Sequence, residues 1–303
     1  MVAVAKLYYD HGLTHQQIAA ELGLSRVKVT RLLAQARLEG IVEIRINEDE
    51  EPFAELGHAV AEKFGLDRVW VAPTAAANST AVTGAAALAH HLTGARVVGV
   101  GLSLTLGSAV THFAETDRPA RADQKSFAPM AGGWGGWQQG LNPGELAVRL
   151  AHRLGGRAFG FPAPLLAPSQ GFAEALQQLP EVRQALELAG SADCLAFGVG
   201  GLDWGTSPLN DSISAAERAS LVRQGAVGDV AARFFDRVGN PVETTVDKRA
   251  IGLRLDQMVS VPTRLLLAHG PSKVEAIHAS LVGGMATVLV TDSDTARSLE
   301  QMT

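Results

Sequence analysis

The sequence predicts an α/β protein with two parts, an N-terminal helix-turn-helix domain and a doubly wound, mainly parallel α/β domain. Two observations lead to this fold class. Residues 14–45 carry the apolar spacing of a helix-turn-helix. Residues 66–303 alternate short, β-branched apolar strands with helices, and glycines gather where those strands end. We therefore expect a small helical module joined to a larger domain built on a parallel sheet.

The helical module is predicted from Thr14–Arg45. Gly23 can take the left-handed conformation that ends a helix, and the short Ala19 side chain lets two helices approach closely. Thr14 and Ser25 are each placed to cap the helix that follows. At helical spacing, the shared core is expected to contain Ile18, Leu22, Leu24, Val29 and Leu32.

The second helix of this module has the features of a DNA-recognition helix. Its first turns, which in such motifs reach base edges in the major groove, are rich in basic and hydroxyl side chains. A generic three-helix segment with a basic solvated face is the alternative interpretation. Val2–His11 is expected to form a supporting first helix, and Ile41–Ile46 a short strand like the wing of a winged helix. The candidate DNA-binding residues are Ser25, Arg26, Lys28, Thr30 and Arg31.

Composition describes a globular chain long enough for two domains. Of its 303 residues 47% are hydrophobic and 19% charged. No apolar run reaches the length that spans a bilayer, and the first residues lack the layout of a signal peptide. The single cysteine, Cys194, lies in an apolar run and is expected to be a buried, inert thiol. These features together predict a cytoplasmic protein.

The charge is divided unevenly along the chain. Residues 1–46 hold six Lys or Arg and four Asp or Glu, whereas the remainder holds 20 and 27. A weakly basic module on an acidic body suits double-stranded DNA only if several copies bind together. We therefore expect a homo-oligomer, a homotetramer built as a dimer of dimers. The predicted organisation is a DNA-binding domain at 1–46, a linker with a possible dimerisation helix at 47–65, and an effector domain at 66–303.

The larger domain is predicted element by element from its apolar runs. Strands are expected at Arg68–Val71, Arg96–Val100, Ser126–Met130, Arg157–Phe161, Asp193–Val199, Arg264–Ala268 and Thr287–Val290. Helices are expected at Pro52–Phe64, Ala81–Leu92, from Thr105, and at Pro143–Leu154, Phe172–Leu179, Glu181–Ala189, Ala215–Gln224, Asp229–Phe235, Ser272–Leu281 and Thr295–Gln301. The pattern of Arg237–Val259 is ambiguous.

Four glycine-rich loops follow predicted strands, where ligands bind in doubly wound folds. Glycine lets backbone N–H groups point into a shared space, and a helix N-terminus attracts an anion. Ser103 and Thr105 add hydroxyl groups, and Lys273 adds a positive charge, although a solvated lysine and ordinary turns would look the same. The loops are Gly99–Thr105, Gly132–Gly136, Gly198–Gly201 and His269–Lys273.

Three stretches resemble a known family. They are Leu7–Ile46, Arg223–Val242 (RQGAVGDVAARFFDRVGNPV) and Ala268–Asp292 (AHGPSKVEAIHASLVGGMATVLVTD). They resemble SorC-type (SorC/DeoR) sugar-binding transcriptional regulators. The resemblance implies a bacterial repressor or activator that binds an operator, an effector domain that binds a sugar phosphate, and a tetrameric assembly. It also implies an effector domain similar in fold to ribose-5-phosphate isomerase and glucosamine-6-phosphate deaminase.

The resemblance also implies an effector site. The loop that holds Gly101, Ser103 and Thr105 matches the family's phosphate-facing loop, and Gly270 with Lys273 matches a second phosphate contact. Asp229 matches a polar residue that faces the sugar, and the pair Gly132 and Gly133 belongs to the same candidate site. The effector is expected to be a sugar phosphate or a related polyol.

The sequence departs from the family pattern at two places. Ser103-Leu104 stands where the family often has Gly-Arg. Ala131 precedes the glycine pair where some members have a lysine that forms a Schiff base, and the spacing of Lys125 does not allow it to replace that residue. These departures leave open which sugar is bound and whether it is phosphorylated. Trp134 and Trp137 in the same loop are core or lid residues, or platforms that stack on a sugar.

Three functions remain open from the residues alone. The leading one is a sensor that is not an enzyme and needs no cofactor. No metal site is expected either, since the neighbours His90 and His91 cannot face one ion together. The second is a sugar-phosphate isomerase, for which a general base is required. The third is a DNA-binding protein whose effector pocket is purely structural. Candidate bases for the isomerase are Asp203, Asp211, Asp229 and Glu243.

Overall fold

The computed structural model of the chain describes residues 1–42, 52–76, 78–115, 125–133, 142–203, 209 and 211–302. Contacts between residues divide it into two compact units, Met1–Glu50 and Glu51–Thr303. Residues 43–46 of the predicted wing strand, residues 47–51 of the predicted linker, and both Trp134 and Trp137 lie outside the described residues. No helix in the described ranges is long and apolar enough to cross a membrane.

The first unit contains three helices, as predicted. They are α1 (Val2–Tyr9), α2 (His15–Leu22) and α3 (Arg26–Leu38). Val4, Ile18, Val29 and Leu33 form the buried cluster that joins them, and Leu24 and Leu32 are half-buried against it. The prediction that Leu22 belongs to this core was wrong. Leu22 lies in the last turn of α2 and is 38% exposed, and Leu33 fills the core one turn after Val29.

The second unit is built on a seven-stranded parallel sheet in the order β1-β10-β9-β5-β2-β3-β4. This order confirms the predicted doubly wound fold. A three-stranded antiparallel sheet, β6-β7-β8, stands beside it. The strands of the large sheet are β1 (Arg68–Ala72), β2 (Val97–Val100), β3 (Ser126–Pro129), β4 (Arg157–Ala158), β5 (Cys194–Phe197), β9 (Thr263–Leu267) and β10 (Val288–Asp292).

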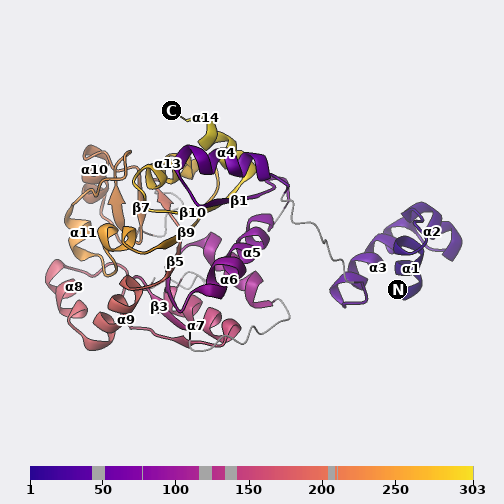
Figure 1. The fold of residues 1–303 in the computed structure, drawn as a ribbon, viewed down its shortest axis with the longest axis horizontal. Helices are drawn as coiled ribbons and strands as arrows, with labels where there is room; N and C mark the ends of the chain where they lie inside the picture. The colour runs from indigo at the N-terminus through magenta and orange to yellow at the C-terminus, as the bar shows by residue number, and fades with distance from the viewer. Residues whose placement is uncertain are drawn as a thin grey trace. The chain divides into compact units, whose positions relative to one another are not determined.

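Helices cover both faces of the large sheet (Figure 1). On one face pack α5 (Ser79–Gly94), α6 (Leu104–Glu115) and α7 (Pro143–Leu154). On the other pack α4 (Ala54–Phe64), α9 (Pro180–Gly190), α13 (Val274–Val282) and α14 (Ser293–Gln301). The remaining helices are α8 (Gln170–Gln177), α10 (Ala215–Arg223), α11 (Thr245–Arg249) and α12 (Leu255–Val259).

Strand β5 shows how the sequence fills two cores at once. Cys194 and Ala196 pack toward α5, α6 and α7, whereas Leu195 and Phe197 pack into the cluster on the opposite face. Successive side chains of a strand point to opposite faces, so a strand covered on both sides must be apolar throughout. Cys194 is buried, as predicted, and burial raises the pKa of its thiol to about 12, which disfavours the reactive thiolate.

Helix α4 belongs to the second unit. It packs against β1 and α14. The Lys63 ammonium donates hydrogen bonds to the carbonyl oxygens of Leu299 (3.0 Å) and Glu300 (2.8 Å) and to that of Met302. These carbonyl groups end α14 and have no partner inside the helix, so the lysine satisfies them. Gly65 ends α4 with a φ of 65°.

The helix predicted for Asp229–Phe235 was wrong. This segment forms the hairpin of β7 (Gly228–Val230) and β8 (Arg233–Phe235), and β7 also pairs with β6 (Gly200–Gly201). The turn residues Ala231 and Ala232 have φ values of 51° and 63°, and the Asp229 carboxylate accepts a hydrogen bond from the Ala232 N–H at 2.9 Å. Such a side-chain bond to the local backbone competes with helix formation.

A buried arginine connects this hairpin to a later segment of the chain. Arg233 donates to the carbonyl oxygens of Leu253, Ala250 and Gly252 and forms an ion pair with Asp247 at 2.8 Å. These partners all lie in the stretch Arg237–Val259 that the sequence left ambiguous, and it contains the short helices α11 and α12. Long-range bonds of this kind leave no periodic signal in a sequence.

Candidate functional site

The candidate DNA-binding surface of the first unit is formed by two capped helices and the turn between them. The Thr14 hydroxyl accepts from the Gln17 N–H, and the Gln17 side chain accepts from the Thr14 N–H, which completes a capping box. Gly23 ends α2 with a φ of 61°. Ser25 then caps α3, its hydroxyl accepting from the Lys28 N–H at 3.2 Å. Helix α2 therefore begins and ends, and α3 begins, at the residues that the sequence signals predicted.

The predicted basic side chains lie on the outside of this surface. Arg26, Lys28 and Arg31 are all exposed, as contact with DNA requires. Thr30 is exposed too, but its hydroxyl already donates to the Arg26 carbonyl oxygen and lies 3.1 Å from His15 Nδ1. Thr30 therefore joins the two helices, and Ser25 serves as a cap. Of the five predicted DNA-binding residues, the three cations are therefore the ones whose polar groups can contact DNA.

The second candidate surface is the edge where the parallel strands end. The loop after β5 lies between two others. Gly198 lies so close to Ser103 that a Cβ atom on residue 198 would overlap the Ser103 side chain. A Cβ atom on Gly201 would lie 2.6 Å from the Ser272 carbonyl oxygen, beside Lys273. Glycine is thus required here by close approach, and three of the four predicted loops meet at one place.

The loop after β2 leads into α6. The Gly101 N–H donates to the Ala196 carbonyl oxygen at 2.8 Å, and the Ser103 hydroxyl accepts from the Leu106 N–H at 2.9 Å. Ser103 is therefore the cap of α6, and its acceptor is in use. Thr105 is 7% exposed, and no hydrogen bond of its hydroxyl is found within the described residues. The first N–H groups of α6 also have no partner inside the helix.

In the second predicted loop, the described residues Gly132 and Gly133 contribute less than expected. The Gly132 N–H donates to the Ile251 carbonyl oxygen, and the Gly133 N–H donates to the Ala163 carbonyl oxygen. Both amides are therefore occupied by the protein backbone. In this conformation Gly132 and Gly133 hold neighbouring segments together and offer no free donor to a ligand.

Asp229 and Lys273 form an electrostatic pair. Asp229 is 8% exposed and lies directly over Gly200. Burial raises the pKa of its carboxyl to about 6, against the hydrogen bond from Ala232 and the charge of Lys273. Lys273 is half-buried, and burial lowers the pKa of its ammonium, against the attraction of Asp229. Each charge is thus held where water solvates it poorly, which favours pairing with a polar or charged group.

In the fourth predicted loop, the backbone N–H of Gly270 already has a hydrogen-bond partner. Gly270 has a φ of 102°, which favours glycine, and its N–H donates to the Thr295 hydroxyl at 2.9 Å. The chain then forms a 3-10 turn, Pro271–Lys273, before α13 begins, so Lys273 stands at the cap of that helix. The Gly270 amide is therefore not open to a phosphate in this conformation, although Lys273 is.

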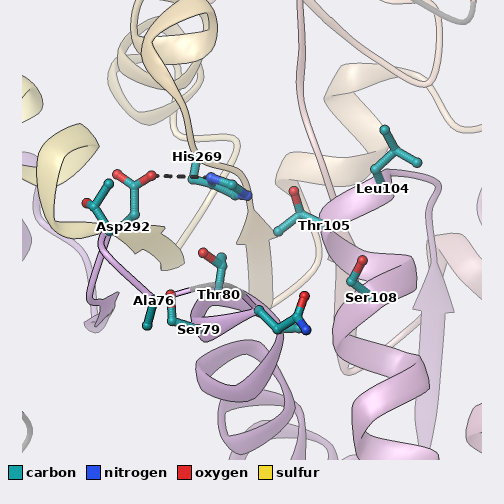
Figure 2. Close-up of a pocket in the computed structure, with 11 residues that line it drawn as sticks. Ala76, Ser79, Thr80, Leu104, Thr105, Ser108, His269 and Asp292 are labelled. Carbon is teal, nitrogen blue, oxygen red and sulfur yellow. Dashed lines mark hydrogen bonds and ion pairs between the residues drawn. The ribbon is translucent and has the colours of Figure 1, made fainter.

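A cavity of about 360 Å³ opens at the same edge. It lies between the N-termini of α5 and α6 and the ends of β9 and β10 (Figure 2). Its polar lining includes Thr105, His269 and Asp292, and the His269 Nδ1 atom lies 3.2 Å from an Asp292 oxygen. The other nitrogen of the His269 ring points away from Asp292, toward Thr105. The further lining residues are Thr74, Ala76, Asn78, Ser79, Thr80, Ala81, Leu104 and Ser108.

Of the predicted effector residues, Thr105 alone lines this cavity. Glycine at the strand ends points to the loops, but not to the polar residues that the same rule places there. Asp292 is the last residue of β10, and His269 follows β9 by two residues. A search for polar side chains after each strand could have found both.

Comparison with known proteins identifies the chain. Residues 50–299 match a family model described as "Putative sugar-binding domain". The transcriptional regulator LsrR of Klebsiella pneumoniae is 32% identical over 304 residues, covering 98% of this chain and 91% of the relative. LsrR of Escherichia coli K12 is 31% identical over 301 residues, covering 98% and 92%.

The solved structures agree. The full-length sorbitol operon regulator SorC of Klebsiella pneumoniae superposes with a TM-score of 0.79 at 25% identity, over 99% of this chain and 97% of that one. The chain belongs to the SorC-type family of sugar-binding transcriptional regulators. The superposition on SorC covers both the helix-turn-helix and the parallel sheet, and the predicted resemblance is confirmed.

The carboxylates considered as catalytic bases differ in their exposure. Asp203, Asp211 and Glu243 are exposed, and Asp229 is buried beside Lys273. No group of three His, Cys, Asp or Glu side chains that could hold a metal ion is found in the part of the chain that the structure describes. What the strand-end edge offers is hydroxyl groups, a His–Asp pair, one ammonium and helix N-termini.

Proposed function

We propose that the chain binds operator DNA through α3 and that a sugar phosphate, held at the strand-end edge, controls this binding. The observation that carries the proposal is the meeting of the loops after β2, β5 and β9 beside a cavity of about 360 Å³. A ligand that binds two arrangements of the protein unequally shifts the population between them. Function as a sensor requires no catalysis, and we propose that the chain has none.

The phosphate is assigned to the N-terminus of α6. Its free N–H groups, the buried Thr105 hydroxyl and the Lys273 ammonium supply the donors that an anion requires. The hydroxyl groups of the sugar would then meet Asp229 and the His269–Asp292 pair. Because the amides of Gly132, Gly133 and Gly270 are occupied, their part in the site is to shape the backbone.

An unphosphorylated polyol is the second candidate. The cavity lining holds Thr, Ser and Asn side chains and a His–Asp pair, and no Lys or Arg side chain is found among its described residues. Such groups suit neutral hydroxyl groups as well as an anion. The two candidates differ in whether the ligand needs Lys273.

The experiment compares Lys273→Met with Thr105→Val. A thermal-shift screen with phosphorylated and free sugars and polyols first finds a ligand, because binding to the native state raises its melting temperature. Calorimetry then measures that ligand on both variants. For a phosphate bound as proposed, Lys273→Met weakens binding by about 10- to 100-fold and Thr105→Val by about fivefold.

The controls separate the candidates. Lys248→Met removes an exposed lysine of the same unit and should change nothing. Lys273→Met should leave operator affinity without effector unchanged. If Thr105→Val weakens binding of the ligand and Lys273→Met does not, the phosphate assignment is wrong and the ligand is a neutral polyol.

We further propose that the protein works as a homotetramer in the bacterial cytoplasm, where its DNA lies. The support is electrostatic, since residues 1–46 carry an excess of two positive charges and one such module binds DNA weakly. Four modules on a repeated or palindromic operator would supply the affinity. Light scattering should give the mass of four chains, and a monomer at micromolar concentration with and without DNA would exclude this assembly.

A further inference from the structure

One apolar side chain stands among the cations of the recognition helix. Val27, the second residue of α3, is 78% exposed. It lies between Arg26 and Lys28, which are exposed as well. Valine is a poorer helix former than Ala, Arg or Lys, and at this exposure it gains little from packing. Val27 therefore contributes little to the folding of the first unit as the structure shows it.

The position of Val27 on the helix is fixed by the core. Val29, Leu33 and Ala36 are the buried residues of α3. At 3.6 residues per turn, Val27 lies about 160° around the helix from the centre of that buried stripe. Arg31 follows one turn later on the same outward side. Val27 and Arg31 therefore form the ridge farthest from the core, in the first two turns of the helix.

The groove that such a ridge enters offers one apolar group. Base edges in the major groove present hydrogen-bond donors and acceptors, and thymine adds a C5-methyl group. Arg26, Lys28 and Arg31 around Val27 match the charge of the flanking phosphates. Since the Thr30 hydroxyl is engaged with Arg26 and His15, it does not compete for the bases at this place.

We propose that Val27 contacts the methyl group of a thymine in each half-site of the operator. This inference rests on the proposed entry of α3 into the major groove, and it adds a specificity-determining residue outside the set chosen by charge. Apolar contact between the valine side chain and the methyl group would replace water at both surfaces. The operator should therefore carry a thymine next to the position that Arg31 contacts.

The test begins with full-length protein and a pool of randomised duplex DNA. Selection of bound duplexes gives the operator, and if no sequence is enriched the proposed operator binding itself fails. Each thymine of the selected operator is then replaced by deoxyuridine, which lacks only the methyl group. At one thymine per half-site, wild-type affinity should fall about three- to fivefold, the value of one buried methyl group.

The decisive measurement combines this replacement with Val27→Ala. The variant should bind the thymine and deoxyuridine operators equally, because the partner of the methyl group is gone. Val2→Ala, at a valine of α1 that is 53% exposed, is the matched control and should keep the wild-type ratio. The melting temperature of Val27→Ala should not fall, since alanine favours the helix.

Two results would overturn the proposal. One is a Val27→Ala variant that still distinguishes thymine from deoxyuridine as well as wild type does. The other is an operator in which no such replacement weakens wild-type binding. If Val27→Ala instead lowers the mass found by light scattering, Val27 contacts a second copy of the chain, and the proposed contact with thymine is wrong.

Discussion

The two candidate surfaces of this protein use positive charge in opposite ways. On α3, Arg26, Lys28 and Arg31 are exposed side chains around the apolar Val27. At the strand-end edge, Lys273 is half-buried and coupled to the buried Asp229. An exposed cation costs little to hold and is screened by salt, whereas a buried one lowers stability unless its charge is compensated.

This difference follows from the size of the ligand. DNA is a long polyanion that meets an open surface, so each contact is partly solvated and affinity accumulates over many of them. A small ligand must be enclosed, and each of its polar groups needs a partner, since an unpaired buried group is costly. Mutation of the first surface should therefore leave the stability of the protein unchanged, while mutation of the second should change it.

The largest effect is expected when the exposed charges are removed. Arg26→Ala, Lys28→Ala and Arg31→Ala together should weaken operator binding about 100-fold or more, at about 1–3 kcal/mol for each base contact. The dependence of affinity on salt should flatten, because contacts with phosphate groups are lost as well. Binding measured between 50 and 200 mM salt tests both statements.

The controls for this variant use the same contrast. Its melting temperature and its effector affinity should equal those of wild type. Replacing Arg183, Arg223 and Arg297 by alanine removes the same charge from exposed sites of the second unit and should leave operator binding nearly unchanged. Normal operator affinity in the α3 variant would show that this helix does not read the DNA.

A smaller effect is expected from the buried carboxyl group. Because burial raises the pKa of Asp229 to about 6, the native state binds its proton more tightly than the unfolded chain, and stability falls as pH rises from about 4 to 6. This loss amounts to roughly 3 kcal/mol. Asp229→Asn cannot ionise, and its carbonyl oxygen can still accept from Ala232. The difference in unfolding free energy between the variant and wild type should therefore shift in favour of the variant between pH 4.5 and pH 7.5.

Denaturant unfolding at the two pH values measures this gain. Asp211→Asn, which changes an exposed carboxylate of the same unit, should show none. If both variants follow the pH dependence of wild type, the Asp229 carboxyl does not lower the stability of the effector unit near neutral pH, and the contrast between the two surfaces disappears.

Local signals were sufficient to predict the three described helices of the first unit. Thr14, Gly23 and Ser25 act within four residues of their own position, so their roles can be inferred from the sequence directly. The strands of the parallel sheet were also predictable, since burial on both faces requires apolar runs such as Cys194–Phe197. Both predictions depend on the periodicity of one element at a time.

What escaped prediction depends on contacts between distant segments. The hairpin at Asp229–Phe235 is held by Arg233 and its partners some 14 to 20 residues away. The amides of Gly132 and Gly133 are taken by Ile251 and Ala163, which no spacing rule connects to them. The cavity was missed because His269 and Asp292 meet only when β9 and β10 lie side by side.

The close contact between Gly198 and Ser103 has a consequence for the evolution of this edge. A side chain at position 198 would occupy the space of the side chain at position 103. A larger side chain at one of these positions therefore requires a smaller one at the other. Gly200 and Asp229 are coupled in the same way. Among related chains these positions should therefore change in pairs, alanine at 198 accompanying glycine at 103. Leu104, 62% exposed at the mouth of the cavity, can vary alone and is where new effector preferences can arise by single substitutions.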